Sequence, residues 1–208
     1  MNRIKLFAGA SLCALVAAGA AAAGPPVGSF PVQAPKPAKV LYNQNSNYAG
    51  GGINSQTYEA SFSQYDDQGA DDFVVPGHAT WTITEVDVSG QYYNGSGPAT
   101  SEDVIFYTDS NGMPGATVAT FSNVKGTDKN GAFSITLPGK GAKLKKGKYW
   151  VSVIANLNYT QGGEWNWDTN SVLHGDPAMW RTQGGQWSAP NGAGPDLMFA
   201  LRGTAKRD

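Results

Sequence analysis

Cysteine is almost missing from the sequence, which has one cysteine, Cys13, in 208 residues. Cys13 lies inside the apolar N-terminal run Leu6–Ala23, which we expect to be removed as part of a leader peptide. The remaining chain then has no disulfide, no thiolate nucleophile and no thiolate metal site. We therefore expect a domain that is held together by its own hydrophobic core.

Histidine is also scarce, and the familiar hydrolase motifs are missing. The two histidines, His78 and His174, are far apart, and the sequence has neither an H-E-x-x-H nor a G-x-S-x-G motif. This excludes the common zinc-peptidase and nucleophile-elbow arrangements. A glycosidase needs only two carboxyl groups that face one cleft, so a small hydrolase stays open as an alternative. The leading expectation is a protein that is not an enzyme.

The N-terminal residues have the pattern of a secretory signal peptide. Arg3 and Lys5 precede the apolar run, which ends in small residues, so we expect residues 1–23 to be cleaved. This predicts a secreted protein, in the periplasm, on the cell surface or in the medium, without a stable membrane span. Five prolines in residues 24–39 indicate a linker. The rest, residues 40–205, is expected to form one domain.

Net charge argues against nucleic acid as a partner. Removal of Arg3 and Lys5 leaves 13 basic and 16 acidic residues, and 13 − 16 gives a formal charge of −3. A weakly acidic domain does not attract a polyanion.

Residues of alternating polarity indicate an all-β fold. Short segments rich in β-branched and aromatic residues are separated by Gly, Pro and Asn, and no stripe of helical period interrupts them. The clearest strand candidates are residues 80–90, 103–109, 117–124, 132–138, 148–157 and 196–203. In residues 80–90, strict alternation places Trp81 and Ile83 on one face, and Val86 and Val88 on the other.

Tight turns support the same fold class. Asn-Gly pairs at 94–95, 111–112, 130–131 and 191–192 suit hairpin connections, because both residues accept positive φ. We predict a two-sheet antiparallel β-sandwich, jelly-roll-like, with eight or nine strands.

Three segments, taken together in their order along the chain, resemble a loosely defined group of secreted bacterial β-sandwich modules. They are ADDFVVPGHATWTITEVDVSGQYY (residues 70–93), VIFYTDSNGMPGATVAT (104–120) and LKKGKYWVSVIANL (144–157), the last followed by GEWNWD. The resemblance covers most of residues 40–203. It implies export and a sandwich fold, and it implies no reaction.

Four of the six tryptophans lie within 26 residues, from Gly162 to Trp187. Sandwich domains that bind carbohydrate often stack sugar rings on exposed aromatic faces. Trp165, Trp167, Trp180 and Trp187 are therefore candidates for a sugar platform, with Tyr92, Tyr93 and Tyr159 as neighbours if the loops cluster. The alternative is that the tryptophans, above all Trp165 and Trp167, pack in the core, as large aromatic residues usually do.

Four aspartates, Asp66, Asp67, Asp71 and Asp72, lie within seven residues. Calcium takes six to eight oxygen ligands, mainly from carboxylates and carbonyls, so these residues form a candidate calcium site. Their spacing matches no known calcium loop, and the alternative is a structural role in which Asp71 or Asp72 accepts hydrogen bonds from backbone amides.

The sequence therefore favours a secreted, non-catalytic module that binds an extracellular or cell-surface carbohydrate. Two alternatives stay open: a structural or adhesive envelope or matrix protein without a small ligand, and a small hydrolase on the same scaffold. Calcium is compatible with all three.

Overall fold

The computed structural model describes residues 38–190 and 195–207, all within the second of the two units, Pro37–Asp208, into which the chain divides. The predicted signal peptide, almost all of the predicted linker and the Asn191-Gly192 turn lie outside the described residues. The described part is all-β, as predicted, and its strands pair antiparallel except for one short parallel pair, β3 with β12.

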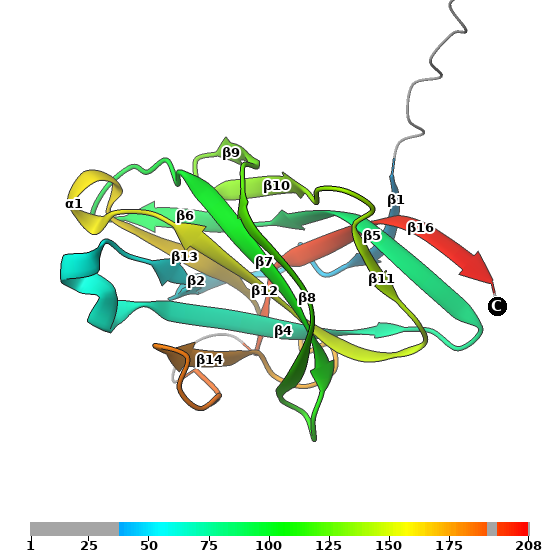
Figure 1. The fold of residues 1–208 in the computed structure, drawn as a ribbon. Coiled ribbons are helices and arrows are strands. Elements are labelled where there is room, and N and C mark those ends of the chain that lie inside the picture. The colour runs from blue at the N-terminus through cyan, green and yellow to red at the C-terminus, as the bar shows by residue number, and fades with distance from the viewer. Residues whose placement is uncertain (1–37, 191–194, 208) are drawn as a thin grey trace, which may run out of the picture. The chain divides into compact units, whose positions relative to one another are not determined.

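Hydrogen bonding divides the strands into three sheets, where two were expected (Figure 1). The first sheet has the order β1-β16-β5-β10-β9, and β11 also pairs with β5. The second has the order β14-β4-β3-β12-β7-β8, and the small third sheet has the order β15-β13-β2, with β6 also on β13.

The strands of the first sheet are β1 (Lys39–Asn43), β5 (Ala79–Val88), β9 (Thr127–Lys129), β10 (Ala132–Thr136), β11 (Ala142–Leu144) and β16 (Phe199–Arg207). Those of the second are β3 (Gln56–Thr57), β4 (Asp67–Val75), β7 (Ser101–Asp109), β8 (Pro114–Val124), β12 (Gly147–Asn156) and β14 (Met179–Thr182). Those of the third are β2 (Tyr48–Asn54), β6 (Gly90–Tyr93), β13 (Glu164–Asn170) and β15 (Asp196–Leu197). Two short helices, the 3-10 helix η1 (Ala60–Tyr65) and α1 (Tyr159–Gly162), complete the described elements.

The count of eight or nine strands was too low, since 16 strands lie in the described residues. Each of the six segments predicted as strands contains a strand in the structure. Strands of two to four residues were not predicted, because they contain too few alternating residues to be recognised from the sequence. Asn111-Gly112 and Asn130-Gly131 have positive φ at both residues and join β7 to β8 and β9 to β10. The turn prediction is confirmed at these two sites and is wrong at Asn94-Gly95, where only Asn94 has positive φ and the preceding strand β6 pairs with β13.

A β-bulge in β5 overturns the predicted division of its faces. Arg202 lies opposite Glu85 and Gly203 lies opposite Ile83, so β5 has one additional residue at this point. The bulge reverses the alternation, and Ile83 and Val86 are both fully buried in the main core. Simple period-two counting fails here because a bulge shifts the pattern by one residue.

A second, smaller core lies on the outer face of the second sheet. Ala70, Tyr107 and Trp150 are buried there, under Met179 of β14 and Trp187. Strand β12 is consequently buried on both faces, which explains its nearly continuous run of apolar residues. No helix among residues 38–190 and 195–207 has the length and apolar character needed to cross a membrane.

Candidate functional site

Trp165 and Trp167 do not form a sugar platform, because both side chains are completely buried. They lie on the same face of β13, as alternation predicted, but this face points into the main core. The Trp165 ring stacks on Phe133 at 4.8 Å between centroids. The indole N–H groups donate to the carbonyls of Gly131 and Met198, each at 2.8 Å. The core-packing alternative holds for these two residues, and the platform prediction is wrong for them.

Trp180 and Trp187 are partly exposed but lie in different surroundings. Trp180 packs against the main core, and its indole N–H donates to the carbonyl of Asn54 at 3.1 Å. Trp187 packs edge-on against Tyr107 and carries the Arg181 guanidinium 4.2 Å above its ring. The four tryptophans therefore do not share one binding face.

A different set of aromatic side chains lines a groove of about 430 Å³. We call it the aromatic groove, and its aromatic residues are Tyr58, Phe62, Tyr65 and Tyr159. Ring centroids are 6.5 Å apart for Tyr58 and Tyr159, 5.4 Å for Tyr159 and Phe62, and 6.4 Å for Phe62 and Tyr65. The rings thus form a continuous row, and Tyr65 at its end is 56% exposed.

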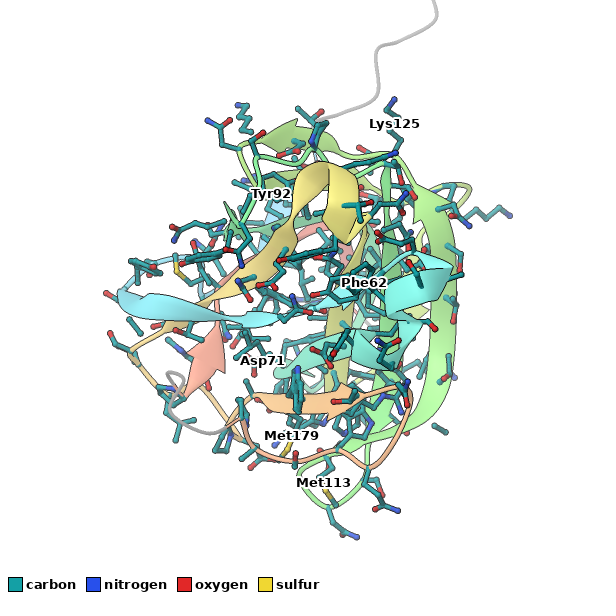
Figure 2. The ribbon with its side chains drawn as sticks, turned by 90° about the vertical axis from the view of Figure 1, so that its left-hand side faces the viewer. Phe62, Asp71, Tyr92, Met113, Lys125 and Met179 are labelled. Atoms are coloured by element: carbon teal, nitrogen blue, oxygen red, sulfur yellow. The ribbon has the colours of Figure 1, made fainter. Side chains whose placement is uncertain are left out.

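Two short helices, distant in sequence, bring these rings together. Helix η1 and helix α1 lie at the same end of the described β domain, the end that faces the viewer in Figure 2, where Phe62 is labelled. Glu59 fixes their relative position, because its carboxylate accepts the backbone N–H of Tyr159 at 2.7 Å and that of Thr160 at 3.2 Å. No residue of η1 is buried, so Phe62 and Tyr65 are not held there by burial in the core.

Two polar residues that line the aromatic groove each have a buried side-chain oxygen without a hydrogen-bond partner. The polar residues of the groove are Asn54, Asp67 and Glu164. Among the described residues, four buried side-chain oxygens lack such a partner, and Asn54 Oδ1 and Asp67 Oδ1 are two of them. The Asn54 amide is held by its other end, since Nδ2 donates to Tyr58 Oη at 2.9 Å and to the Trp165 carbonyl at 3.3 Å. Asn54 Oδ1 is therefore a fixed acceptor.

The electrostatics of the aromatic groove are dominated by carboxylates. Burial raises the pKa of Asp67 to about 6, and the charges of Asp66 and Glu164 act in the same direction. A hydrogen bond with Thr182 lowers it in part. Burial also raises the pKa of the Tyr58 hydroxyl, and the charge of Glu164 raises it further. Tyr58 therefore keeps its proton, and because its oxygen already accepts from Asn54, the O–H can donate to a ligand.

The four aspartates predicted as a calcium site are not gathered in one place. Asp71 and Asp72 are adjacent in β4 and point to opposite faces of the strand, whereas Asp67 lines the aromatic groove. Asp66 accepts the backbone N–H of Tyr58 at 2.8 Å. No group of three or more His, Cys, Asp or Glu side chains in the described ranges could hold a metal ion. Calcium binding stays an untested prediction, without the four-residue site that motivated it.

Asp71 and Asp72 have the structural role that the alternative assigned to them. The Asp71 carboxylate accepts Gln44 Nε2 at 2.7 Å, Leu197 N at 2.6 Å and Asp72 N at 2.7 Å. It thereby joins β4 to the chain after β1 and to β15. Asp72 pairs with Lys148 Nζ at 3.1 Å and accepts the backbone N–H of Asp176 at 3.1 Å.

Of the residues that line the aromatic groove, the sequence made Tyr159 a candidate for sugar binding and Asp67 a candidate for calcium, and it did not single out the rings of Tyr58, Phe62 and Tyr65. The signal was present in QTYEASFSQYDD, where Tyr58, Phe62 and Tyr65 are spaced by four and three residues within polar sequence. This spacing places side chains on one side of a helical turn. A scan against models of known protein families finds no match, and a search of curated proteins finds none either.

Proposed function

We propose that the chain is a non-catalytic module that binds a carbohydrate in the aromatic groove. One observation carries the proposal: two buried acceptor oxygens, Asn54 Oδ1 and Asp67 Oδ1, lack partners beside a row of four accessible aromatic rings. A volume of about 430 Å³ is in the range of small-ligand sites.

Sugars have hydroxyl groups that can donate to the unpaired acceptor oxygens and C–H groups that can pack on the aromatic rings. A buried acceptor without a donor costs about 1–3 kcal/mol, and a ligand hydroxyl that donates to it removes the cost. The faces of pyranose rings carry C–H groups that pack on aromatic rings, while the hydroxyls at the edge of the sugar reach the polar wall. Both elements of recognition are adjacent here, because Tyr58 belongs to the ring row and is hydrogen-bonded to Asn54.

A glycan array followed by calorimetry tests the proposal. We expect the wild-type protein to bind an oligosaccharide and Tyr159→Ala to weaken this binding by roughly tenfold or more, equivalent to about 1.4 kcal/mol. The matched control is Tyr48→Ala, since Tyr48 is 46% exposed at the opposite end of β2 from Asn54. Absence of glycan binding by the wild type, or equal binding by Tyr159→Ala, would refute the proposal.

A second candidate, glycoside hydrolysis, is favoured by the presence of Asp67 and Glu164 in one groove. Retaining and inverting glycosidases use two carboxyl groups, one of which is protonated and acts as the acid. Asp67, with a pKa raised to about 6 by burial, suits the acid. Release of reducing sugar from a bound oligosaccharide, abolished in both Asp67→Asn and Glu164→Gln, would establish catalysis. Intact ligand after long incubation would leave binding as the function.

Export is part of the proposal and depends on residues 1–23, outside the described residues. We expect the full chain to be recovered from the periplasm, the cell surface or the medium, shortened at its N-terminus. A version without residues 1–23 should stay in the cytoplasm. Recovery of the full-length chain from the cytoplasm, with its N-terminus intact, would contradict secretion.

A further inference from the structure

We infer that the ligand of the aromatic groove is positively charged, and that it is an oligosaccharide of amino sugars with free, protonated amines. The inference rests on the proposed carbohydrate binding and specifies its ligand class. It is argued from the charges that line the groove, from the rings beside them and from the positions of the protein's own cations.

The aromatic groove has negative charge that no basic side chain of its wall offsets. Asp67 and Glu164 line it, and no lysine, arginine or histidine belongs to its described lining. Asp66 adds to this charge from an adjoining hollow that also contains Asp67. A ligand with a carboxylate, sulfate or phosphate would be repelled, whereas an ammonium group would be attracted by all three carboxylates.

The aromatic rings favour the same kind of ligand. A cation over the face of an aromatic ring, within about 6 Å of its centroid, is attracted by the electrons of the ring. The contribution is about 0.5–1 kcal/mol at exposed sites and about 2 kcal/mol when the cation is desolvated. The rings of Tyr58, Tyr159 and Phe62 border the wall that holds the carboxylates. An ammonium group on a sugar therefore finds ring faces and carboxylates in one groove.

Arg181, a basic residue on the strand that pairs with Asp67, is engaged elsewhere. Arg181 is in β14, next to Thr182, which is paired with Asp67 in the ladder. Its guanidinium donates to Gln68 Oε1 at 2.9 and 2.7 Å and lies over the Trp187 ring. Arg181 thus contributes to the outer face of the second sheet and does not line the aromatic groove.

A comparison of three matched oligosaccharides tests the inference by calorimetry at near-neutral pH and low salt, with a chelator present. The probes are a glucosamine trimer, an N-acetylglucosamine trimer and a glucose trimer of the same linkage. We expect the glucosamine trimer to bind at least about tenfold more tightly than the other two. Raising the salt concentration should reduce this preference, because the charges at the groove mouth are screened.

Two substitutions that remove a negative charge and keep the shape of the side chain test whether the carboxylates of the groove cause the preference for glucosamine. Asp67→Asn and Glu164→Gln should each reduce the preference for the glucosamine trimer over the glucose trimer by roughly tenfold. Glu85→Gln is the matched control, because Glu85 is on β5 of the first sheet and contacts Ser134 and Arg202. This control should bind all three trimers as the wild type does.

The outcomes separate the inference from the proposed function. Equal binding of the glucose and glucosamine trimers would overturn the inference and leave carbohydrate binding intact. Preference for glucosamine that persists in both Asp67→Asn and Glu164→Gln would also overturn it, since the charge would then act elsewhere. Failure of every oligosaccharide to bind would overturn the inference together with the proposed function.

Discussion

Asp71 and Asp67 are four residues apart in β4, and their surroundings differ in one decisive respect. Asp71 is fully buried, and its carboxylate accepts three N–H groups. Asp67 is only partly buried, yet its Oδ1 is enclosed without a partner. Burial alone therefore does not identify a functional carboxylate. Asp71, whose hydrogen bonds are complete, belongs to the framework, whereas Asp67 lines the aromatic groove and is the carboxylate that we propose contacts the ligand.

The aromatic residues divide in the same way. Trp165 and Trp167 are buried and donate their N–H groups to backbone carbonyls, so no part of them is left for recognition. Phe62, Tyr65 and Tyr159 are held on two short helices at the surface and line a groove. The predictions that follow test this division between framework and site.

Replacement of Trp167 by alanine should have the largest effect. The side chain is fully buried against Phe199 and Trp165, so its removal leaves a large cavity and takes away one of the two hydrogen bonds to the Met198 carbonyl, which keeps that from Ser89 N. We expect the free energy of unfolding to fall by about 3–5 kcal/mol in chemical denaturation. Any Trp167→Ala protein that still folds should bind carbohydrate with unchanged affinity. A stable variant with lost binding would return Trp167 to the site.

Asp71→Ala should be the next most damaging change. It removes the side-chain acceptor of Leu197 N and Asp72 N, whereas Gln44 Nε2 keeps its second acceptor, the Leu197 carbonyl at 2.8 Å. We expect a loss of about 3 kcal/mol in the free energy of unfolding. Asp67→Ala is the matched comparison and should change stability by less than about 1 kcal/mol, because its Oδ1 makes no hydrogen bond and the change removes only the hydrogen bond with Thr182. Equal losses in the two variants would remove the distinction between framework and site.

The sequence predicts the framework better than the site, for physical reasons. Strands such as β7 and β10 contain enough alternating residues to be recognised, and the Asn-Gly hairpins require positive φ. The bulge in β5 and the three-sheet division depend on pairing between distant segments, which local periodicity does not encode. The aromatic groove joins η1 to α1 through Glu59, about 100 residues away, so only one of its rings, Tyr159, was a candidate beforehand.

Stability should depend on pH through Asp67. Its pKa is raised to about 6 in the folded chain from an ordinary value of 3.8, so the folded state holds this proton more tightly. The resulting stabilisation is complete below about pH 4 and is lost as the pH rises through about 6. Across this pH range, we expect the free energy of unfolding of the wild type to fall by about 1–2 kcal/mol relative to that of Asp67→Asn. This is less than the full pKa shift implies, because solvent screens part of the carboxylate. Parallel pH profiles for the two proteins would show that Asp67 is not perturbed.

Tyr58→Phe should have the smallest effect on stability and on affinity. It separates the contribution of the Tyr58 ring to the aromatic row from the contribution of its hydroxyl group. The change keeps the ring in the aromatic row and removes the hydroxyl that accepts Asn54 Nδ2 at 2.9 Å. Asn54 retains its hydrogen bond to the Trp165 carbonyl, so stability should change by less than about 1 kcal/mol. Affinity for the oligosaccharide should fall by roughly fivefold, about 1 kcal/mol, because one donor to the ligand is lost. If calorimetry instead shows unchanged affinity for Tyr58→Phe and a large loss for Tyr159→Ala, the ligand is recognised by ring faces alone, and the polar wall contributes nothing.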